Sequence, residues 1–237
     1  MTARIVVVTG STGSIGTAVR RSFAENGDTV VGLDLSSGSD QWGSTHACDV
    51  ADEDSVHTAF DTIRSAAGDP TVLVNCAGMA GRGGVLEEPL DVWRRILDVN
   101  LTSVFLCARE VIPGMRRAGG GKILNIASVN GRFGGSALSG PAYATSKGGM
   151  LTLTRFLARE HAPDNVQVNA VAPGPHDTPM WQALDEERRT RILGMLPGGN
   201  GPGDPEDLGA AVVFLCSPAA KYITGATLDI NGGQWMG

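Results

Sequence analysis

The chain has 237 residues, of which 42% are hydrophobic and 19% are charged; this composition excludes a disordered tail and a coiled coil, and the length predicts one domain over residues 1–237. The net charge of −6 argues against nucleic acid and anionic membranes as partners. The longest apolar run near the N-terminus, residues 5–8, is too short for a signal peptide core or a membrane span, which predicts a cytoplasmic protein.

Apolar runs alternate with helical patterns along the chain. The runs rich in β-branched residues predict strands buried on both faces, at residues 4–8, 29–33, 46–50, 72–74, 122–127, 166–171 and 227–230. Apolar positions three or four apart predict helices at residues 14–26, 53–67, 89–117 with a bend near Pro113, and 142–161. Strands joined by helical crossovers indicate an α/β doubly wound parallel sheet (Rossmann fold), with about seven strands and helices on both faces.

Residues 176–203 interrupt this alternation between the sixth strand and the last helix. The charged run 185–191 predicts the solvated face of a short helix. The segment also combines large apolar side chains with a glycine-rich stretch at 198–203. We therefore expect a lid over the substrate, with a permanently packed helix as the alternative.

A glycine-rich motif, TGSTGSIG at residues 9–16, follows the first strand and opens the first helix. Gly10 and Gly13 allow a tight turn and close approach of a pyrophosphate, and Gly16 allows the helix to pack closely on the strand. The helix N-terminus offers N–H groups to the phosphates. No Gly-Lys-Ser/Thr follows, so the motif is not that of a P-loop NTPase.

Asp34 ends the second predicted strand. A carboxylate at this place can accept hydrogen bonds from the adenosine ribose hydroxyls, and it repels a 2′-phosphate. Thr12 and Ser14 in the glycine motif are neutral. This combination predicts NAD rather than NADP as the cofactor, while the plainer interpretation of Asp34 is a turn residue.

Tyr143 and Lys147 are four residues apart on a predicted helix, so both lie on one face. A neighbouring ammonium would lower the pKa of the phenol from about 10 towards about 7–8, where it can exchange a proton. Ser128 follows the fifth strand, at the edge where ligands meet a parallel sheet. Taken singly, these residues are equally compatible with an exposed helix face and a turn cap.

Together these residues resemble the short-chain dehydrogenase/reductase family, in its classical form, along essentially the whole chain. The matching motifs occur in the family's order, at residues 9–16, 75–78, 99–100, 128, 143–147, 173–174 and 231–233. The resemblance implies that Tyr143 is the general acid/base and that Ser128 orients the substrate oxygen. Lys147 would lower the pKa of the tyrosine and hold the nicotinamide ribose, and Asn100 would hold a water that links Lys147 to solvent.

The resemblance also implies the residues that bind the cofactor. Asp49, followed by Val50, would contact the adenine, and the residues near 174 would hold the carboxamide. The full set is Gly10, Thr12, Gly13, Ser14, Ile15, Gly16, Asp34, Asp49, Val50, Asn75, Ala77, Gly78, Tyr143, Lys147, Pro173, Gly174, His176 and Thr178. His176 stands where the family usually has an aliphatic residue, so its side chain is a candidate for contact with the lid or the substrate.

The expected function is hydride transfer between NAD(H) and a small secondary alcohol or ketone. One alternative is a 3-oxoacyl-thioester (ACP or CoA) reductase; those relatives mostly favour NADPH and usually have a basic residue in or after the glycine motif. The other is a non-catalytic cofactor-binding regulator. The resemblance further implies a homotetramer, for which Phe105, Val111, Leu153 and Phe156 on the two long helices are candidates for either the interface or the core.

Overall fold

A computed structural model of the chain describes residues 3–136, 138–198 and 201–237. Its strands are β1 (Ile5–Thr9), β2 (Thr29–Asp34), β3 (Gly38–Asp40), β4 (Gly43–Ala47), β5 (Val72–Asn75), β6 (Gly121–Ile126), β7 (Val166–Pro173) and β8 (Thr227–Ile230). The α-helices are α1 (Ser14–Glu25), α2 (Glu53–Ala67), α3 (Leu90–Leu97), α4 (Ser103–Arg117), α5 (Asn130–Phe133), α6 (Pro141–His161), α7 (Pro179–Gln182), α8 (Glu186–Leu193) and α9 (Pro205–Leu215). Shorter helical turns are η1 (Asp98–Thr102), η2 (Ala162–Asp164) and η3 (Pro218–Ala220).

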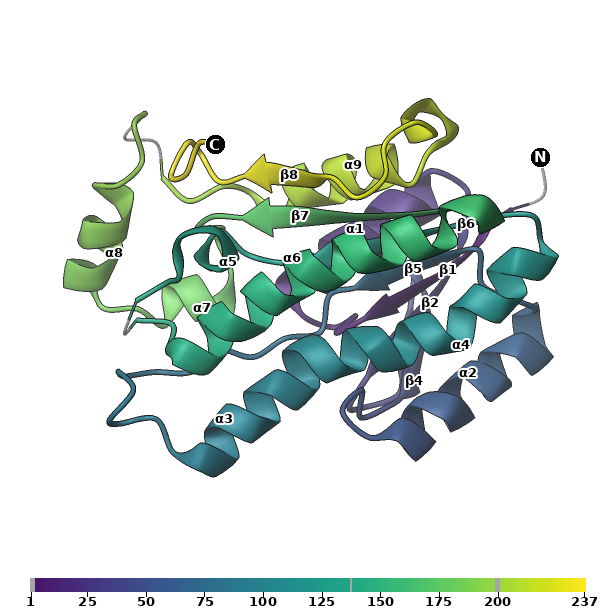
Figure 1. Ribbon diagram of the computed structural model, residues 1–237, viewed down its shortest axis with the longest axis horizontal. Coiled ribbons are helices and arrows are strands. Elements are labelled where there is room, and N and C mark those ends of the chain that lie inside the picture. Colours follow the sequence, from purple (N-terminus) through teal and green to yellow (C-terminus); the bar gives the residue numbers. More distant parts are fainter. Residues whose placement is uncertain (1–2, 137, 199–200) are drawn as a thin grey trace.

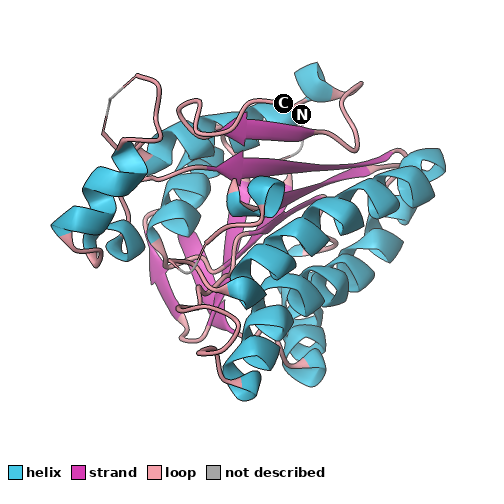
Figure 2. Ribbon diagram, turned by 60° about the vertical axis from the view of Figure 1, so that its left-hand side comes forward, coloured by secondary structure: helices cyan, strands magenta, loops and turns pink. Residues whose placement is uncertain are grey.

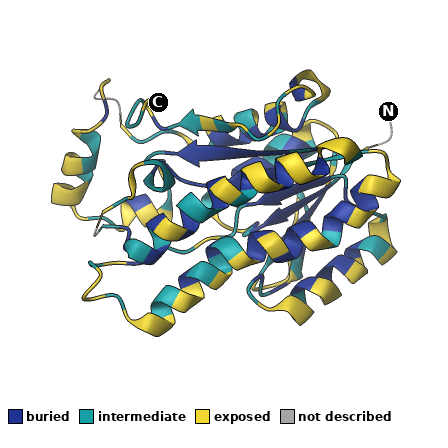
Figure 3. Cartoon of the chain, viewed as in Figure 1, coloured by how far each residue is buried: buried dark blue, intermediate teal, exposed yellow. Residues whose placement is uncertain are grey.

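The strands form one sheet in the order β3-β4-β2-β1-β5-β6-β7-β8, with helices on both faces (Figures 1 and 2). All neighbouring strands are parallel except β3 and β4. The central strands are buried and the helices turn exposed residues outward (Figure 3), as expected for apolar runs without alternation. The predicted doubly wound Rossmann fold is confirmed.

The sheet has eight described strands rather than about seven, and the difference lies at one edge. The strand predicted at residues 46–50 corresponds to β4, Gly43–Ala47, which pairs with β2 over residues 44–47. The predicted strand therefore began three residues too late. A hairpin joins β4 to the short antiparallel β3, which the prediction missed. Both strands are mostly polar, and β3 is fully exposed. Polar edge strands carry no hydrophobic signal in a sequence.

Apolar cores separate the sheet from its helices on both faces. One core lies under α2, α4 and α6 and includes Phe60, Leu73 and Met115. Another lies under α1 and α9 and includes Phe23 and Val212. No helix within the described ranges is long and apolar enough to cross a membrane.

The helix predicted over residues 89–117 is three consecutive segments, α3, η1 and α4. Pro113 lies inside α4, whereas the irregular π-helical turn is η1, which contains the buried Asn100. A π-helical turn inside a helix is rare and occurs often at functional sites. The helical irregularity therefore includes Asn100, one of the predicted catalytic residues, whereas Pro113 lies within the continuous helix α4.

Residues 176–198 contain α7 and the predicted charged helix, α8, and are exposed along much of their length. Two backbone hydrogen bonds pin the base of the segment, from Asp177 N to Gly203 O at 2.9 Å and from Gly203 N to Pro175 O at 3.0 Å. Trp181 is buried and Met180 is exposed. Residues 199 and 200 of the predicted hinge lie outside the described residues, and closure of the segment over a substrate stays a prediction.

Candidate active site

The predicted site lies at the carboxyl edge of the sheet, where the connections from neighbouring strands run to opposite sides. From β1 the chain proceeds to β2 on one side and later to β5 on the other, which makes the gap between β1 and β5 the switch point of the fold. The Thr9 hydroxyl oxygen accepts the N–H groups of Cys76 and Ala77 at 3.0 and 3.1 Å. The glycine motif is thereby tied to the loop after β5.

The glycine motif has the shape needed to hold a pyrophosphate. Gly10 has φ +62°, and a Cβ there would stand 2.7 Å from Ala77 Cα. A Cβ at Gly16 would clash with Gly10 O. Gly13 is exposed and, among the described residues, no side chain caps the helix α1 that begins after it. The first N–H groups of α1 are thus free to bind an anion, and a dinucleotide cofactor fits this end of the sheet.

Asp34 lies across from the glycine motif at the end of β2. Its Oδ2 accepts the backbone N–H of Thr12 at 2.9 Å and the Thr12 hydroxyl at 2.7 Å, and its Oδ1 accepts Leu35 N at 2.8 Å. An ionised carboxylate has about four acceptor positions. One position therefore remains for a ribose hydroxyl, and displacement of the Thr12 hydroxyl would open a second.

The predicted catalytic side chains come together at the carboxyl end of β6 and near Gly78 in the loop after β5. The Lys147 ammonium is buried and donates to Ile126 O at 2.7 Å, at the end of β6. The Ser128 hydroxyl lies close enough to Tyr143 to lower the pKa of the phenol, and its oxygen accepts Asn130 N at 3.2 Å. A Cβ added at Gly78 would stand 3.5 Å from both Asn100 Oδ1 and Lys147 Nζ. The structure thus groups all four predicted catalytic residues around the loop that begins at Gly78.

The comparisons with known proteins agree with this geometry. A sequence model of the enoyl-(acyl carrier protein) reductase family matches residues 10–234. The chain is 36% identical over 241 residues to a 3-oxoacyl-(acyl-carrier-protein) reductase of Vibrio harveyi, with 98% of each chain covered. It is 38% identical over 245 residues to a cis-4-hydroxycyclohexanecarboxylate dehydrogenase of Sinomonas cyclohexanicum, with 97% of this chain and 96% of the relative covered. The chain belongs to the short-chain dehydrogenase/reductase family. It is therefore an oxidoreductase of a family that binds a nicotinamide cofactor.

The electrostatics of this dehydrogenase/reductase site differ from the prediction. Burial raises the pKa of the Tyr143 phenol, and the Ser128 side chain opposes this effect with the smaller influence. The expectation that Lys147 lowers the tyrosine pKa is therefore wrong for the free protein. The ammonium lies 5.8 Å from the centre of the phenol ring and is directed to Ile126 O. Burial also lowers the pKa of Lys147 itself to about 8.

The Asn100 side chain is held between the loop after β5 and helix α6. Its Nδ2 donates to Met79 O at 2.9 Å and to Ser146 Oγ at 3.0 Å, and its Oδ1 accepts Met79 N at 2.9 Å. Both N–H donors of the side chain are used, and one lone pair of Oδ1 remains. The role of Asn100 in holding a relay water stays a prediction, and the side chain can accept one hydrogen bond for it.

Three of the predicted cofactor residues are paired or buried within the protein. The Asp49 carboxylate pairs with Arg95 at 2.9 Å. The Asn75 side chain donates to Asn125 Oδ1 at 2.8 Å, and Val50 is buried. These contacts are compatible with a place in the wall of the cleft, and direct contact of these residues with the cofactor stays a prediction.

His176 is a buried, neutral histidine at the base of the 176–203 segment. Its Nδ1 lies 3.1 Å from Gly174 O, and since a carbonyl oxygen only accepts, Nδ1 carries the proton. Burial lowers the pKa of His176. The ring packs against Gly203, where a Cβ would come within 3.0 Å of it. The His176 side chain therefore contacts the far end of the predicted lid segment. Contact with the lid was one of the two alternatives expected, the other being contact with the substrate.

The loop after β7 presents the remaining predicted cofactor residues. Pro173 O accepts Val129 N at 2.9 Å, and Gly174 N donates to Ile230 O at 3.0 Å. The Thr178 hydroxyl caps α7 by accepting Trp181 N at 3.3 Å. Because the oxygen is the acceptor in this bond, the Thr178 O–H is free to donate, as binding of a carboxamide would require.

Several residues of the site were not found from the sequence. Thr9 stands in the recognised motif, and Asn125 is a polar residue inside a strand that is mostly apolar. Both could therefore have been identified as site residues from the sequence. Ser146 and Glu88 carried no such signal, because their partners, Asn100 and Ala142, are distant in the chain.

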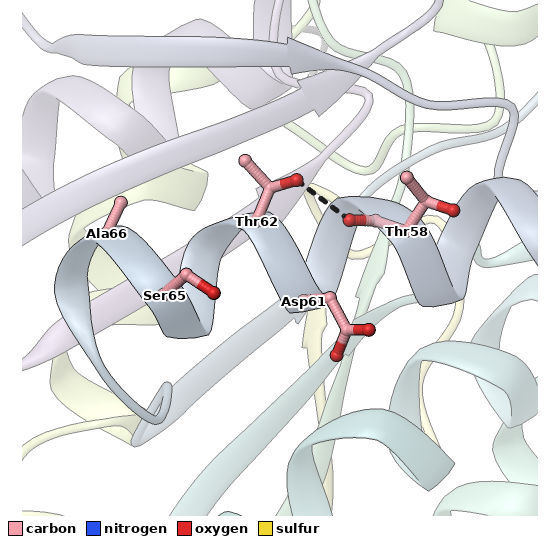
Figure 4. A pocket seen from close by; sticks show the side chains of 5 residues that line it. All are labelled: Thr58, Asp61, Thr62, Ser65 and Ala66. Atoms are coloured by element: carbon pink, nitrogen blue, oxygen red, sulfur yellow. Dashed lines mark hydrogen bonds between the residues drawn. The ribbon is translucent and has the colours of Figure 1, made fainter.

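A shallow, open hollow lies elsewhere, on the outer side of α2 (Figure 4). Its lining residues all come from this one helix: Thr58, Asp61, Thr62, Ser65 and Ala66. None of them is a predicted site residue. The hollow therefore does not belong to the candidate active site.

Proposed function

We propose that the chain is an NAD(H)-dependent dehydrogenase or reductase that interconverts a secondary alcohol and its ketone. The observation that carries this proposal is the grouping of Ser128, Tyr143 and Lys147 at the carboxyl edge of the sheet, beside the loop after β5. The same grouping argues against a cofactor-binding regulator, which would not need these side chains together.

The cofactor, when bound, supplies or accepts the hydride. The protein residues handle the oxygen of the substrate and its proton. In reduction, the Tyr143 phenol donates a proton to the carbonyl oxygen, and the Ser128 hydroxyl orients that oxygen by a second hydrogen bond. In oxidation, the Tyr143 phenolate takes the proton of the alcohol and becomes a phenol as the neutral ketone forms. The Lys147 ammonium would hold the nicotinamide ribose.

Asp34 supports NAD(H) over NADP(H) within this proposal. Its carboxylate stands at the end of β2 and contacts the glycine motif through Thr12. A 2′-phosphate at this place would meet a negative charge without a compensating cation. The buried guanidinium of Arg20 is committed to Asp40 and Gly43 O.

We expect catalytic efficiency with NADH to exceed that with NADPH by at least about tenfold, which corresponds to about 1.4 kcal/mol. The test measures kcat/KM for both cofactors across a panel of ketones, for the parent enzyme and the variant Asp34→Asn. Asp34→Asn should reduce the difference in kcat/KM between NADH and NADPH, because it removes the repulsion between the carboxylate and the 2′-phosphate. Asp49→Asn serves as the control, since it should weaken both cofactors alike. Equal or better efficiency of the parent enzyme with NADPH would contradict the cofactor assignment.

A second candidate substrate is a 3-oxoacyl thioester, because relatives that are 34–36% identical over almost the whole chain are 3-oxoacyl-(acyl-carrier-protein) reductases. The dehydrogenase from Sinomonas cyclohexanicum acts, by its name, on a hydroxylated ring acid. The same panel therefore includes 4-oxocyclohexanecarboxylate and a short 3-oxoacyl thioester. Clearly higher kcat/KM with the thioester would replace the proposed substrate class and leave the catalytic residues unchanged.

We also propose a homotetramer. Of the predicted interface residues, Val111 is core and Leu153 packs against the core. Phe105 on α4 and Phe156 on α6 remain 46% and 61% exposed, on two helices that cover the same face (Figures 1 and 2). A symmetric assembly that pairs these helices would bury both rings.

Light scattering should give a mass about four times that of the 24.6 kDa chain at micromolar concentration. Phe156→Glu should lower this mass, because it places charge in the buried interface. Leu86→Glu should not, because Leu86 is an exposed residue of the loop before α3. The mass of a monomer for the parent protein would refute the assembly.

A further inference from the structure

The helix that carries Tyr143 begins without a cap of its own. Tyr143 is the third residue of α6, after Pro141 and Ala142. Pro141 has no N–H, and the N-cap Gly140 has no side chain to accept one. The first N–H group of this helix therefore belongs to Ala142, directly before the tyrosine, in the turn where helices fray most easily.

Glu88 supplies the missing acceptor from a distant part of the chain. Its Oε1 accepts the Ala142 N–H at 3.0 Å, across 54 residues of sequence. Glu88 itself is fixed by its backbone N–H, which donates to Gly84 O at 3.1 Å. A carboxylate at this end of a helix is also favoured by the helix dipole.

The chain is shaped around this carboxylate on both sides. A Cβ added at Gly81 or at Gly140 would clash with Glu88 Oε2. Gly140 also has φ +78°, which favours glycine for its own reason. Gly81 N donates to Ser139 O at 3.0 Å, so the same two loops are joined a second time. Glu88 is therefore enclosed between the loop after β5 and the segment that leads into α6.

We propose that Glu88 is a positioning residue for Tyr143: by capping Ala142 it holds the first turn of α6, and with it the phenol, in place against Ser128. This inference rests on the proposed function, because it takes Tyr143 as the proton donor. A displacement of about 1 Å at a reacting group can lower a rate by up to about 100-fold. The cap therefore acts on turnover without touching the substrate.

The test compares Glu88→Gln, Glu88→Asp and Glu88→Ala in the full-length protein. Glutamine keeps an acceptor at the same reach, whereas aspartate is one methylene too short and alanine has no acceptor. We expect about a tenfold loss of kcat for the aspartate and alanine variants, with KM for the cofactor within about twofold of the parent value. The glutamine variant should keep kcat within about threefold.

Glu87→Ala is the matched control. Glu87 stands next to Glu88, and its Oε2 accepts Gly84 N at 2.6 Å within the same turn, but it is exposed. The Glu87→Ala variant should have the kcat and the cofactor KM of the parent enzyme.

Hydrogen exchange gives a readout that needs no activity. Amides of residues 142–147 should exchange faster in Glu88→Asp than in Glu88→Gln, while the rest of α6 remains protected. Equal kcat and equal exchange for these two variants would overturn the proposal. Absence of turnover by the parent enzyme with every substrate of the panel would instead refute the proposed function, and the exchange comparison would still decide whether Glu88 caps α6.

Discussion

Replacing Tyr143 by phenylalanine is expected to lower turnover by about 10²–10⁴-fold or more. The change removes the phenolic O–H that donates the proton in reduction and keeps the ring that packs in the site. Steady-state kcat with the best ketone of the panel provides the measurement. Tyr222→Phe is the control, because Tyr222 is the other tyrosine of the chain and is fully exposed. Near-normal turnover of the Tyr143 variant at neutral pH would show that another group transfers the proton.

The pH profile of the parent enzyme completes this test. Burial raises the pKa of Tyr143, so at neutral pH the residue is a phenol, the form that reduction requires. Oxidation requires the phenolate, and its rate should therefore rise as the pH increases. A flat oxidation profile from about pH 6 to 9, with chemistry shown to be rate-limiting, would count against a titrating phenol.

Replacing Lys147 by methionine is expected to abolish most activity and yet stabilise the cofactor-free protein. The ammonium is buried, and burial lowers its pKa from 10.5 to about 8. This difference corresponds to about 3 kcal/mol, of which the lost hydrogen bond to Ile126 O offsets about 1 kcal/mol. The free energy of unfolding at pH 7 should therefore rise by about 1–2 kcal/mol in denaturant titrations.

The pH dependence of stability follows from the same pKa. Below about pH 8 both folded and unfolded chains carry the Lys147 proton, and the folded protein bears the full cost of the buried charge. Between about pH 8 and 10.5 the unfolded chain binds more protons, so the parent protein should gain stability as the pH rises through this window. The methionine variant should lack this gain.

Lys221→Met is the control for the lysine prediction, because Lys221 is exposed. It should change neither the stability at pH 7 nor its dependence on pH. Equal or lower stability of Lys147→Met at pH 7 would mean that the buried ammonium is better stabilised than its hydrogen bond to Ile126 O implies.

The residues of the central sheet and of the glycine motif were predictable from the sequence because their signals are local. The run at residues 5–8 is apolar throughout, and β1 lies largely buried between two helical layers. The motif that follows it must turn sharply and open a helix, which a few glycines make visible. Tyr143 and Lys147 were found for the same reason, since a helix brings residues four apart together.

The edge hairpin, the turn at Asn100 and the pKa of Tyr143 depended on the tertiary structure. The strands β3 and β4 are polar, and only pairing with β2 makes β4 a strand. Asn100 lies in a π-helical turn and bonds Met79, 21 residues away. The pKa of Tyr143 rises because burial outweighs the neighbouring groups, and burial is a property of the packed chain.

The sequence by itself therefore determined most of the sheet, the glycine motif and the pairing of Tyr143 with Lys147 on one helix, because each depends on residues close together in the chain. Only the tertiary structure decided how those residues are held and ionised. The cap on α6 is the clearest case: Glu88 and Ala142 are 54 residues apart, and no period or motif connects them. A hydrogen bond across such a separation forms only after β5, β6 and the helices over them have packed together.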